Sequence, residues 1–197
     1  MDKPTPTVDQ VIRDLERLLA MAAGTHAIAT DGVRLELKHF TELPPDLENP
    51  NPMVYFGTGD PNDPKHYKYA AWTLSNIPSM LSEDGFVIRQ LGQQWAVFVF
   101  DEWESWVRPR LAHAHGCKPN DIMVEVFGDL RLIRHDIVHN GGTASAKSSG
   151  SCRVLRWFDA GHPIAITGEH VADLHSKVPW RELAAGPAAG RASPASP

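Results

Sequence analysis

The most apolar stretch of the chain is FVIRQLGQQWAVFVFDEWESWVRPRLAH, residues 86–113. Its middle, Trp95 to Phe100, is compatible with a buried strand if periodicity alone is considered. The length of the whole stretch and its clustered aromatic residues favour one long buried helix. We therefore expect this helix to belong to the core of a mainly helical bundle.

A second helix is predicted downstream, over DIMVEVFGDLRLIRHDIVH, residues 121–139. Gly116 makes a turn before it, Asn120 is its expected N-cap, and Asn-Gly-Gly at residues 140–142 is a stop signal. Apolar residues recur at helical spacing on its expected inner face, namely Ile122, Val126, Leu130, Ile133 and Ile137.

The N-terminal region is expected to mix a helix with a hairpin. Residues 8–23 have the apolar spacing of an amphipathic helix, which Gly24 is expected to end. Two short runs then flank Asp31-Gly32, a dipeptide typical of a tight hairpin turn. The many prolines of residues 41–64 predict an irregular loop.

The remaining segments are shorter. Residues 65–82 have a helical pattern, and residues 143–151, TASAKSSGS, predict a small, polar, flexible loop. Residues 152–158 and 163–167 are strand-like and close enough together to form a hairpin. Residues 169–177 predict a last short helix.

The predicted fold class is therefore α+β and mainly α, a helical bundle with two peripheral β-hairpins. We expect residues 1–64 to form a helix, a hairpin and a proline-rich loop that pack on the core. Residues 65–178 are expected to form the helical domain with a C-terminal hairpin and helix. The Ala/Gly/Pro/Ser composition of residues 179–197 predicts a disordered tail.

Composition limits the class of protein further. The chain has 197 residues, of which 42% are apolar and 22% charged, so disorder over its full length is excluded. No apolar run reaches the ~18 residues of a membrane-spanning helix, and the first residues lack the layout of a secretory signal. Cys117 and Cys152 are too few for a disulfide scaffold or a cysteine-only zinc site. We expect a cytoplasmic protein with free thiols and no membrane contact.

Charge is distributed unevenly along the chain. The net charge of −5 argues against a strongly basic nucleic-acid-binding surface. Residues 1–104 contain 8 Lys and Arg against 16 Asp and Glu, whereas residues 105–157 contain 8 against 4. A locally positive segment can still bind a phosphate backbone, although such fluctuations also arise by chance along any chain.

The densest polar cluster on an apolar helix is RLIRHDIVHN, residues 131–140. Arg134 is followed by the polar His135 and, five positions after the arginine, by His139. This arrangement stands late in a helix and directly before an Asn-Gly stop. It resembles the R-x4–6-H signature of the HEPN family (higher eukaryote and prokaryote nucleotide-binding).

The resemblance covers residues 118–142 most clearly and is compatible with residues 65–142. Many HEPN proteins are metal-independent endoribonucleases of toxin–antitoxin, abortive-infection and CRISPR systems, and they dimerise so that two copies of the motif meet in one cleft. The resemblance implies a HEPN-like helical bundle in which Arg134 and His139 are the catalytic pair and His135 takes the polar position. It also implies RNA as substrate, a homodimer, an antitoxin protein as a further partner, and no metal or cofactor.

The chemistry of RNA cleavage through the 2′-hydroxyl suits these residue types. The reaction requires a base, an acid and a positive charge beside the phosphate. A histidine titrates near neutral pH, and an arginine offers a permanent bidentate fork for phosphate. We expect Arg134 to hold the scissile phosphate and His139 to transfer a proton. The expected supporting residues are Arg131, His135, Asp136 and Asn140.

The spacing of the motif carries a prediction about assembly. Positions five apart lie ~140° apart around a helix, so Arg134 and His139 do not share one face. Two symmetry-related helices can each supply a different group to one cleft. The proposed site therefore requires a dimer.

Other interpretations of these residues remain open. His135 and His139 have the H-x3-H spacing of zinc hydrolases, with Asp136 where a glutamate is expected. Third ligands, by residue type alone, would be His162, Glu169 and His170. A further alternative is a non-catalytic HEPN-like protein that binds nucleotide or a partner chain. In the simplest alternative, the charged residues are ion-paired on the surface and have no functional role.

Overall fold

The computed structural model describes residues 6–44, 49–60, 63 and 67–186. Its α-helices are α1 (Val8–Thr41), α2 (Ile77–Leu81), α3 (Phe86–Glu102), α4 (Arg108–His115), α5 (Glu125–His139), α6 (Gly168–Lys177) and α7 (Trp180–Ala185). The shorter elements are strands β1 (Met53–Thr58) and β2 (Tyr67–Thr73), 3-10 segments η1 (Leu74–Asn76), η3 (Pro119–Asp121) and η4 (Ser149–Ser151), and π-helical η2 (Trp103–Val107).

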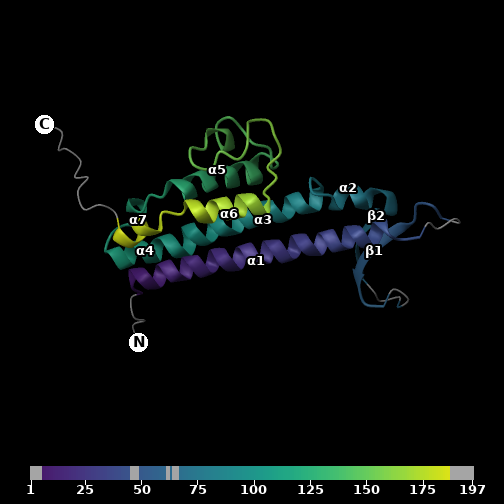
Figure 1. The fold of residues 1–197 in the computed structure, drawn as a ribbon, viewed down its shortest axis with the longest axis horizontal. Coiled ribbons are helices and arrows are strands. Elements are labelled where there is room, and N and C mark those ends of the chain that lie inside the picture. The colour runs from purple at the N-terminus through teal and green to yellow at the C-terminus, as the bar shows by residue number, and fades with distance from the viewer. Residues whose placement is uncertain (1–5, 45–48, 61–62, 64–66, 187–197) are drawn as a thin grey trace. The chain divides into compact units, whose positions relative to one another are not determined.

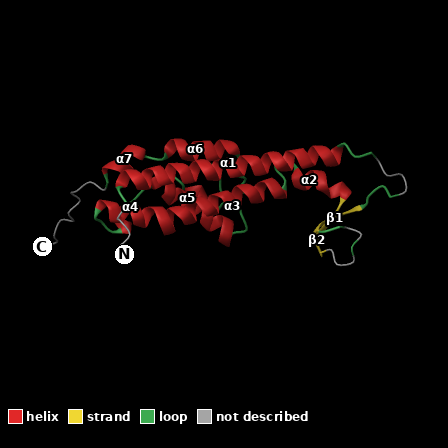
Figure 2. Cartoon of the chain, turned by 90° about the horizontal axis from the view of Figure 1, so that it is seen from below, coloured by secondary structure: helices red, strands yellow, loops and turns green. Residues whose placement is uncertain are grey.

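Helices dominate the described residues, and the named strands there are β1 and β2 (Figure 2). The predicted class, α+β and mainly α, is confirmed. Over the same residues, none of the helices combines the length and the apolar character that crossing a bilayer requires.

The chain divides into two compact units. The larger unit combines residues 1–26 with 92–197, and the smaller unit is residues 27–91. These boundaries differ from the expected segments 1–64 and 65–178, because α1 and α3 each contribute to both units.

The larger unit is built around one apolar core. The predicted long helix is confirmed, since α3, η2 and α4 follow one another without interruption from Phe86 to His115, and its residues from Gly92 onward belong to this unit. Trp103 of η2 stacks on Phe127 of α5, with ring centroids 4.0 Å apart and planes 5° from parallel. The buried residues that α1 contributes recur at helical spacing and are Val11, Leu15, Leu19 and Ala22.

Helix α5 lies where the sequence predicted a helix, but it begins at Glu125 rather than at residue 121. Asn120 is not its cap, because it belongs to the separate 3-10 segment η3, and Val124 precedes the first turn of α5. The expected inner face is confirmed for its central residues. Val126, Leu130 and Ile133 are each at most 2% exposed.

The predicted hairpin at Asp31-Gly32 is wrong, because α1 continues as one helix from Val8 to Thr41. Gly24 does not end the helix, and neither Gly24 nor Gly32 adopts a positive φ. Arg34 pairs with Asp31 one turn away at 2.9 Å, a spacing that fits the helical register. Arg34 also pairs with Glu83 at 2.6 Å.

A hairpin occurs instead in the segment predicted as loop 41–64 and helix 65–82. Strands β1 and β2 pair antiparallel from Met53 opposite Thr73 to Thr58 opposite Tyr67. The register shifts at Gly57, where a Cβ would collide with the backbone of Tyr67. Both predictions failed because aromatic and β-branched residues outweighed the surrounding prolines. Among the described residues of the predicted 65–82 helix, the helical elements are the 3-10 segment η1 and the short helix α2.

The segment between α5 and α6 folds back beside α5 before α6 begins (Figure 1). Residues 143–151 are not a flexible loop, since Ser148 and Ser149 are buried and η4 forms there. The strands predicted at 152–158 and 163–167 do not form, and the pairing found is one isolated bridge between Thr143 and Pro163. The last predicted helix is confirmed as α6.

The expected disordered tail, residues 179–197, begins instead with α7, which buries Leu183 to 4% exposure. Apolar burial against the core explains why this part of the segment is ordered. Residues 187–197 lie outside the described residues.

Candidate functional site

The C-terminal half of α5 carries the sequence-predicted site residues on different sides of one helix. Arg131, His135 and His139 are all exposed and follow one another at four-residue intervals, so they form a row along the open side. The rings of His135 and His139 are 4.9 Å apart between centroids and tilted by 46°. The structure therefore brings these two imidazoles together within one chain.

Arg134 lies on another side of α5 and is directed toward α3. Its Nε is 3.5 Å from an Oδ1 of Asp101, an ion pair in which the arginine side chain is 33% and the aspartate 51% exposed. The Nε atom is buried and makes no hydrogen bond to the described residues. In the single chain the Arg134 guanidinium thus pairs with a carboxylate of α3, and it lies about 100° around α5 from His135 and about 140° from His139.

Asp136 is the most buried of the predicted site residues, at 1% exposure. Its carboxylate accepts four hydrogen bonds from the segment that follows the helix: the backbone N–H of Ser145 at 2.7 Å and of Ser149 at 3.0 Å, and their hydroxyls at 2.9 and 2.8 Å. Burial raises the pKa of Asp136, but these hydrogen bonds outweigh it and hold the pKa below its usual value. Asp136 therefore anchors the 143–151 segment, and the hydrogen bonds of its carboxylate go to Ser145 and Ser149 rather than to the histidines of α5.

Asn140 ends the helix as predicted. Its backbone N–H donates to the Asp136 carbonyl at 3.0 Å, and its side-chain Nδ2 donates to the Thr143 carbonyl at 2.6 Å. Gly141 and Gly142 follow with positive φ angles of 59° and 71°, which glycine adopts without strain. The amide of Asn140 thus shapes the turn after His139.

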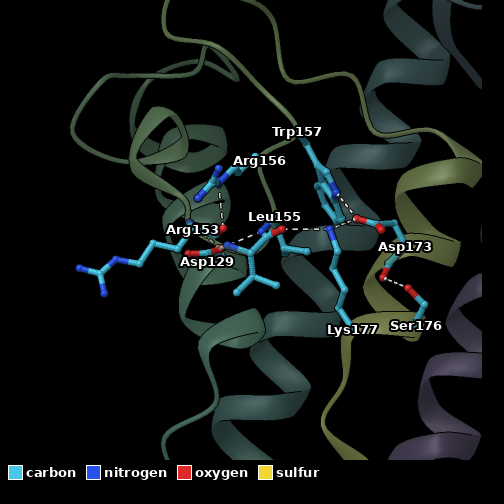
Figure 3. A network of polar contacts seen from close by, with 9 residues as sticks. Asp129, Arg153, Leu155, Arg156, Trp157, Asp173, Ser176 and Lys177 are labelled. Atoms are coloured by element: carbon cyan, nitrogen blue, oxygen red, sulfur yellow. Dashed lines mark hydrogen bonds and ion pairs between the residues drawn. The ribbon is translucent and has the colours of Figure 1, made fainter.

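Asp129, about one and a half turns before Arg134, has a buried carboxylate. It accepts hydrogen bonds from three successive backbone N–H groups, those of Arg153, Val154 and Leu155, at 2.9, 2.6 and 2.8 Å (Figure 3). The buried thiol of Cys152 lies beside it, and burial raises the pKa of that thiol to about 12. Asp129 is the second anchor of the segment between α5 and α6.

Sequence reasoning missed this pair of anchors. The signal was present: two aspartates seven residues apart lie on one side of an apolar helix, followed by a serine-rich segment. Buried carboxylates need hydrogen-bond donors, and short serine-rich segments supply both hydroxyls and free backbone amides.

A catalytic zinc site needs at least one protein ligand beyond His135 and His139. His135 and His139 are adjacent, but nowhere in residues 6–44, 49–60, 63 and 67–186 do three or more His, Cys, Asp or Glu side chains gather to hold a metal ion. His170, one expected third ligand, uses its Nδ1 to accept a hydrogen bond from the Thr167 backbone N–H at 3.0 Å. Burial lowers the pKa of His170, although Asp173 and Glu169 act in the opposite direction.

Comparison with known proteins found no matching family model, no similar curated protein and no similar solved structure. A function for this chain is therefore inferred from its own residues.

Proposed function

We propose that this chain is a metal-independent endoribonuclease of HEPN type that cleaves RNA through the 2′-hydroxyl, acting in a bacterial cytoplasm as a toxin or phage-defence component. The observation that supports it best is the exposed His135–His139 pair at the end of α5, with Arg131 in the same row. The R-x4-H spacing of Arg134 and His139 adds the resemblance to HEPN ribonucleases.

The chemistry follows from the placement of the two imidazoles. One imidazole accepts the 2′-hydroxyl proton, and another donates a proton to the departing 5′-oxygen. His139 lies in the last turn of α5, where the helix macrodipole favours a cation, so we assign it the acid or phosphate-stabilising role. Arginine stabilises the negative charge that develops on the phosphorus oxygens.

In this proposal, Arg134 of one protomer acts in the site that contains His139 of a second copy of the chain. Its pairing with Asp101 is partly exposed, and ion pairs of that kind contribute at most about 1 kcal/mol. A phosphate can therefore replace Asp101 as the partner of Arg134. In a homodimer, Arg134 from one protomer then faces His139 of the other, as the 140° separation on one helix requires. An antitoxin protein that covers this surface belongs to the same proposal.

Substitution of the two motif residues tests the proposal directly. Arg134→Ala and His139→Ala should each lower RNA cleavage by about 10²-fold or more, in buffer containing EDTA, while the protomers stay associated. His162→Ala is the matched control, because His162 is exposed and lies outside α5. Equal cleavage by wild type and by both motif variants would refute the assignment.

A second candidate is a HEPN-like protein that binds nucleotide or a partner without cleaving RNA. The observation in its favour is that Arg134 already has a carboxylate partner within the chain. Purified protein that leaves varied RNAs intact, with and without divalent metal, yet binds a nucleotide would support this candidate. Stoichiometric zinc that is lost on His135→Ala would instead mark a zinc hydrolase.

A further inference from the structure

The two histidines of α5 have a spacing that no other pair of histidines in the chain shares. Among the ten histidines of the sequence, His135 and His139 are the one pair that stands four residues apart. On an α-helix this spacing places two side chains one turn apart on one face, where both imidazoles can bind the same ion. Both residues are exposed, so an ion reaches them directly from solvent.

The distance between the two rings is the distance that one bound metal ion requires. Metal–imidazole bonds of about 2.1 Å, at bond angles of about 90–110°, place the centres of two imidazoles on one ion about 4.5–5.4 Å apart. The ring centroids of His135 and His139 are 4.9 Å apart, and the ring planes are tilted by 46° rather than stacked. The backbone of α5 therefore already sets the two rings at the spacing of a chelate.

The surroundings of the pair decide which ions it suits. The carboxylate of Asp136, between the two histidines in sequence, is buried and accepts hydrogen bonds from Ser145 and Ser149. Elsewhere in the part of the chain that the structure describes, no cluster of three or more His, Cys, Asp or Glu side chains completes a metal site. Two imidazoles without a carboxylate suit Cu²⁺, Ni²⁺ or Zn²⁺, whereas Mg²⁺ and Ca²⁺ prefer oxygen ligands.

The number of ligands and the nearby charges predict an exchangeable ion. Two protein ligands are fewer than the three or four of catalytic and structural zinc sites. Arg131, exposed one turn before His135, repels a cation, whereas the C-terminal end of α5 at His139 attracts one. Affinity for such a site is greater for Cu²⁺ than for Ni²⁺ or Zn²⁺. Cu²⁺ is therefore the ion that this pair holds most tightly, and we expect zinc to be lost during purification.

We infer that His135 and His139 form a two-histidine site for a divalent transition-metal ion, and that the bound ion inhibits RNA cleavage. The inhibition rests on the proposed function, because it takes these imidazoles as the groups that transfer protons. A metal ion binds an imidazole through the same nitrogen lone pair that accepts a proton. The bound nitrogens can neither accept the 2′-hydroxyl proton nor donate one to the 5′-oxygen. The ion is thus an inhibitor, whereas a zinc hydrolase requires its metal for activity.

Binding is measured first, without RNA, by calorimetric titration of CuCl₂ into metal-free protein. The control is His162→Ala, because His162 is exposed and lies outside α5, and it should bind Cu²⁺ as wild type does. Outer-shell groups of metal sites contribute about 10–100-fold to affinity, so the loss of a direct ligand in His135→Ala or His139→Ala should weaken binding at least about tenfold. Equal affinity in wild type and both of these variants would overturn the site.

A second measurement shows whether the two rings bind one ion together. The electron paramagnetic resonance spectrum of the Cu²⁺ complex should contain hyperfine coupling from two imidazole nitrogens in wild type and in His162→Ala. The coupling should be lost in part in each single variant of the pair. The double variant should lose less affinity than the two single losses combined, because removal of either ring already breaks the chelate. Independent losses that add in full would contradict a shared ion.

RNA cleavage is measured last, in metal-free buffer. CuCl₂ should inhibit wild type and His162→Ala over the concentration range in which calorimetry shows binding, EDTA should restore cleavage, and MgCl₂ should not inhibit. Cleavage that stays unchanged or increases when the site is filled would overturn the inhibition. The proposed function fails separately. Wild type that binds Cu²⁺ through these histidines but leaves RNA intact without metal would support the site and contradict the ribonuclease.

Discussion

Substitution of Asp136 tests whether its carboxylate holds the 143–151 segment against α5. Its buried carboxylate is the acceptor of four hydrogen bonds from Ser145 and Ser149. Hydrogen bonds to a charged group contribute about 1.5–3 kcal/mol each, and buried donors left without a partner cost about 1–3 kcal/mol each. These terms are not additive within one cluster. We therefore expect Asp136→Asn to lower the free energy of unfolding by about 2–3 kcal/mol and Asp136→Ala by about 3–5 kcal/mol.

The stability that the Asp136 carboxylate contributes should decrease as the pH is lowered into the acid range. The pKa of Asp136 in the folded protein lies below its usual value, because the hydrogen bonds from Ser145 and Ser149 outweigh the effect of burial. The folded state thus binds this proton less readily than the unfolded state, so the contribution to stability is complete above the unfolded pKa, about 3.9. It is lost as the pH falls through the folded pKa. The difference between wild type and Asp136→Asn should be constant near neutral pH and narrow only below about pH 4.

Urea unfolding followed by tryptophan fluorescence measures both effects. Asp159→Asn serves as the control, because it removes the same charge from an exposed aspartate of the same segment. If Asp136→Asn stays within about 0.5 kcal/mol of this control at neutral pH, the carboxylate does not anchor the segment. A difference that persists unchanged in acid would also contradict the reasoning, since protonation of Asp136 should remove it.

Three shorter predictions concern neighbouring features. Gly142→Ala should lower the free energy of unfolding by about 1–3 kcal/mol in thermal scans. The φ angle of Gly142 is 71°, and the Cβ of an alanine there would collide with the buried side chain of Gln93. Phe127→Ala should cost about 3–5 kcal/mol by urea unfolding, since it removes the stack on Trp103. Asp101→Asn should change stability by less than about 1 kcal/mol and leave RNA cleavage at wild-type level or above, because it frees Arg134. A tenfold loss of cleavage in that variant would contradict the role given to Arg134.

The elements that the sequence predicted well are those whose apolar periodicity is long and uninterrupted. The 86–113 stretch and the inner face of α5 contain enough buried residues that local pattern and tertiary packing agree. The hairpin predicted at Asp31-Gly32 failed because an Asp-Gly dipeptide permits a tight turn but does not require one. Nothing in α1 required a positive φ there, and helix-favouring residues on both sides carried the helix through.

The segment after α5 was mispredicted for a different reason. Its order comes from contacts between residues 9 to 26 positions apart, from Ser145 to Asp136 and from Leu155 to Asp129. Local composition records only that the segment is small and polar, which describes a flexible loop equally well. Of the candidate site, the helix, its end and the separation of Arg134 from His139 followed from helical geometry alone. The partner of Arg134 did not, because Asp101 is 33 residues away on another helix.

Because Arg134 and His139 lie on different sides of α5, the proposed dimer can be tested by mixing two inactive variants and measuring RNA cleavage. Two inactive variants, Arg134→Ala and His139→Ala, are unfolded together and refolded as an equal mixture. If each site pools the arginine of one protomer with the histidine of its partner, a mixed dimer contains one complete site and one site that lacks both groups. Random pairing makes half of the dimers mixed, so cleavage should recover to about a quarter of the wild-type rate. Either variant refolded alone is the control and should stay inactive. Recovery is impossible if both groups must come from one chain, so a mixture as inactive as its components would show that Arg134 does not complete the site of a partner. The proposed phosphate contact would then have to come from within one α5 helix, where Arg131, His135 and His139 form an exposed row.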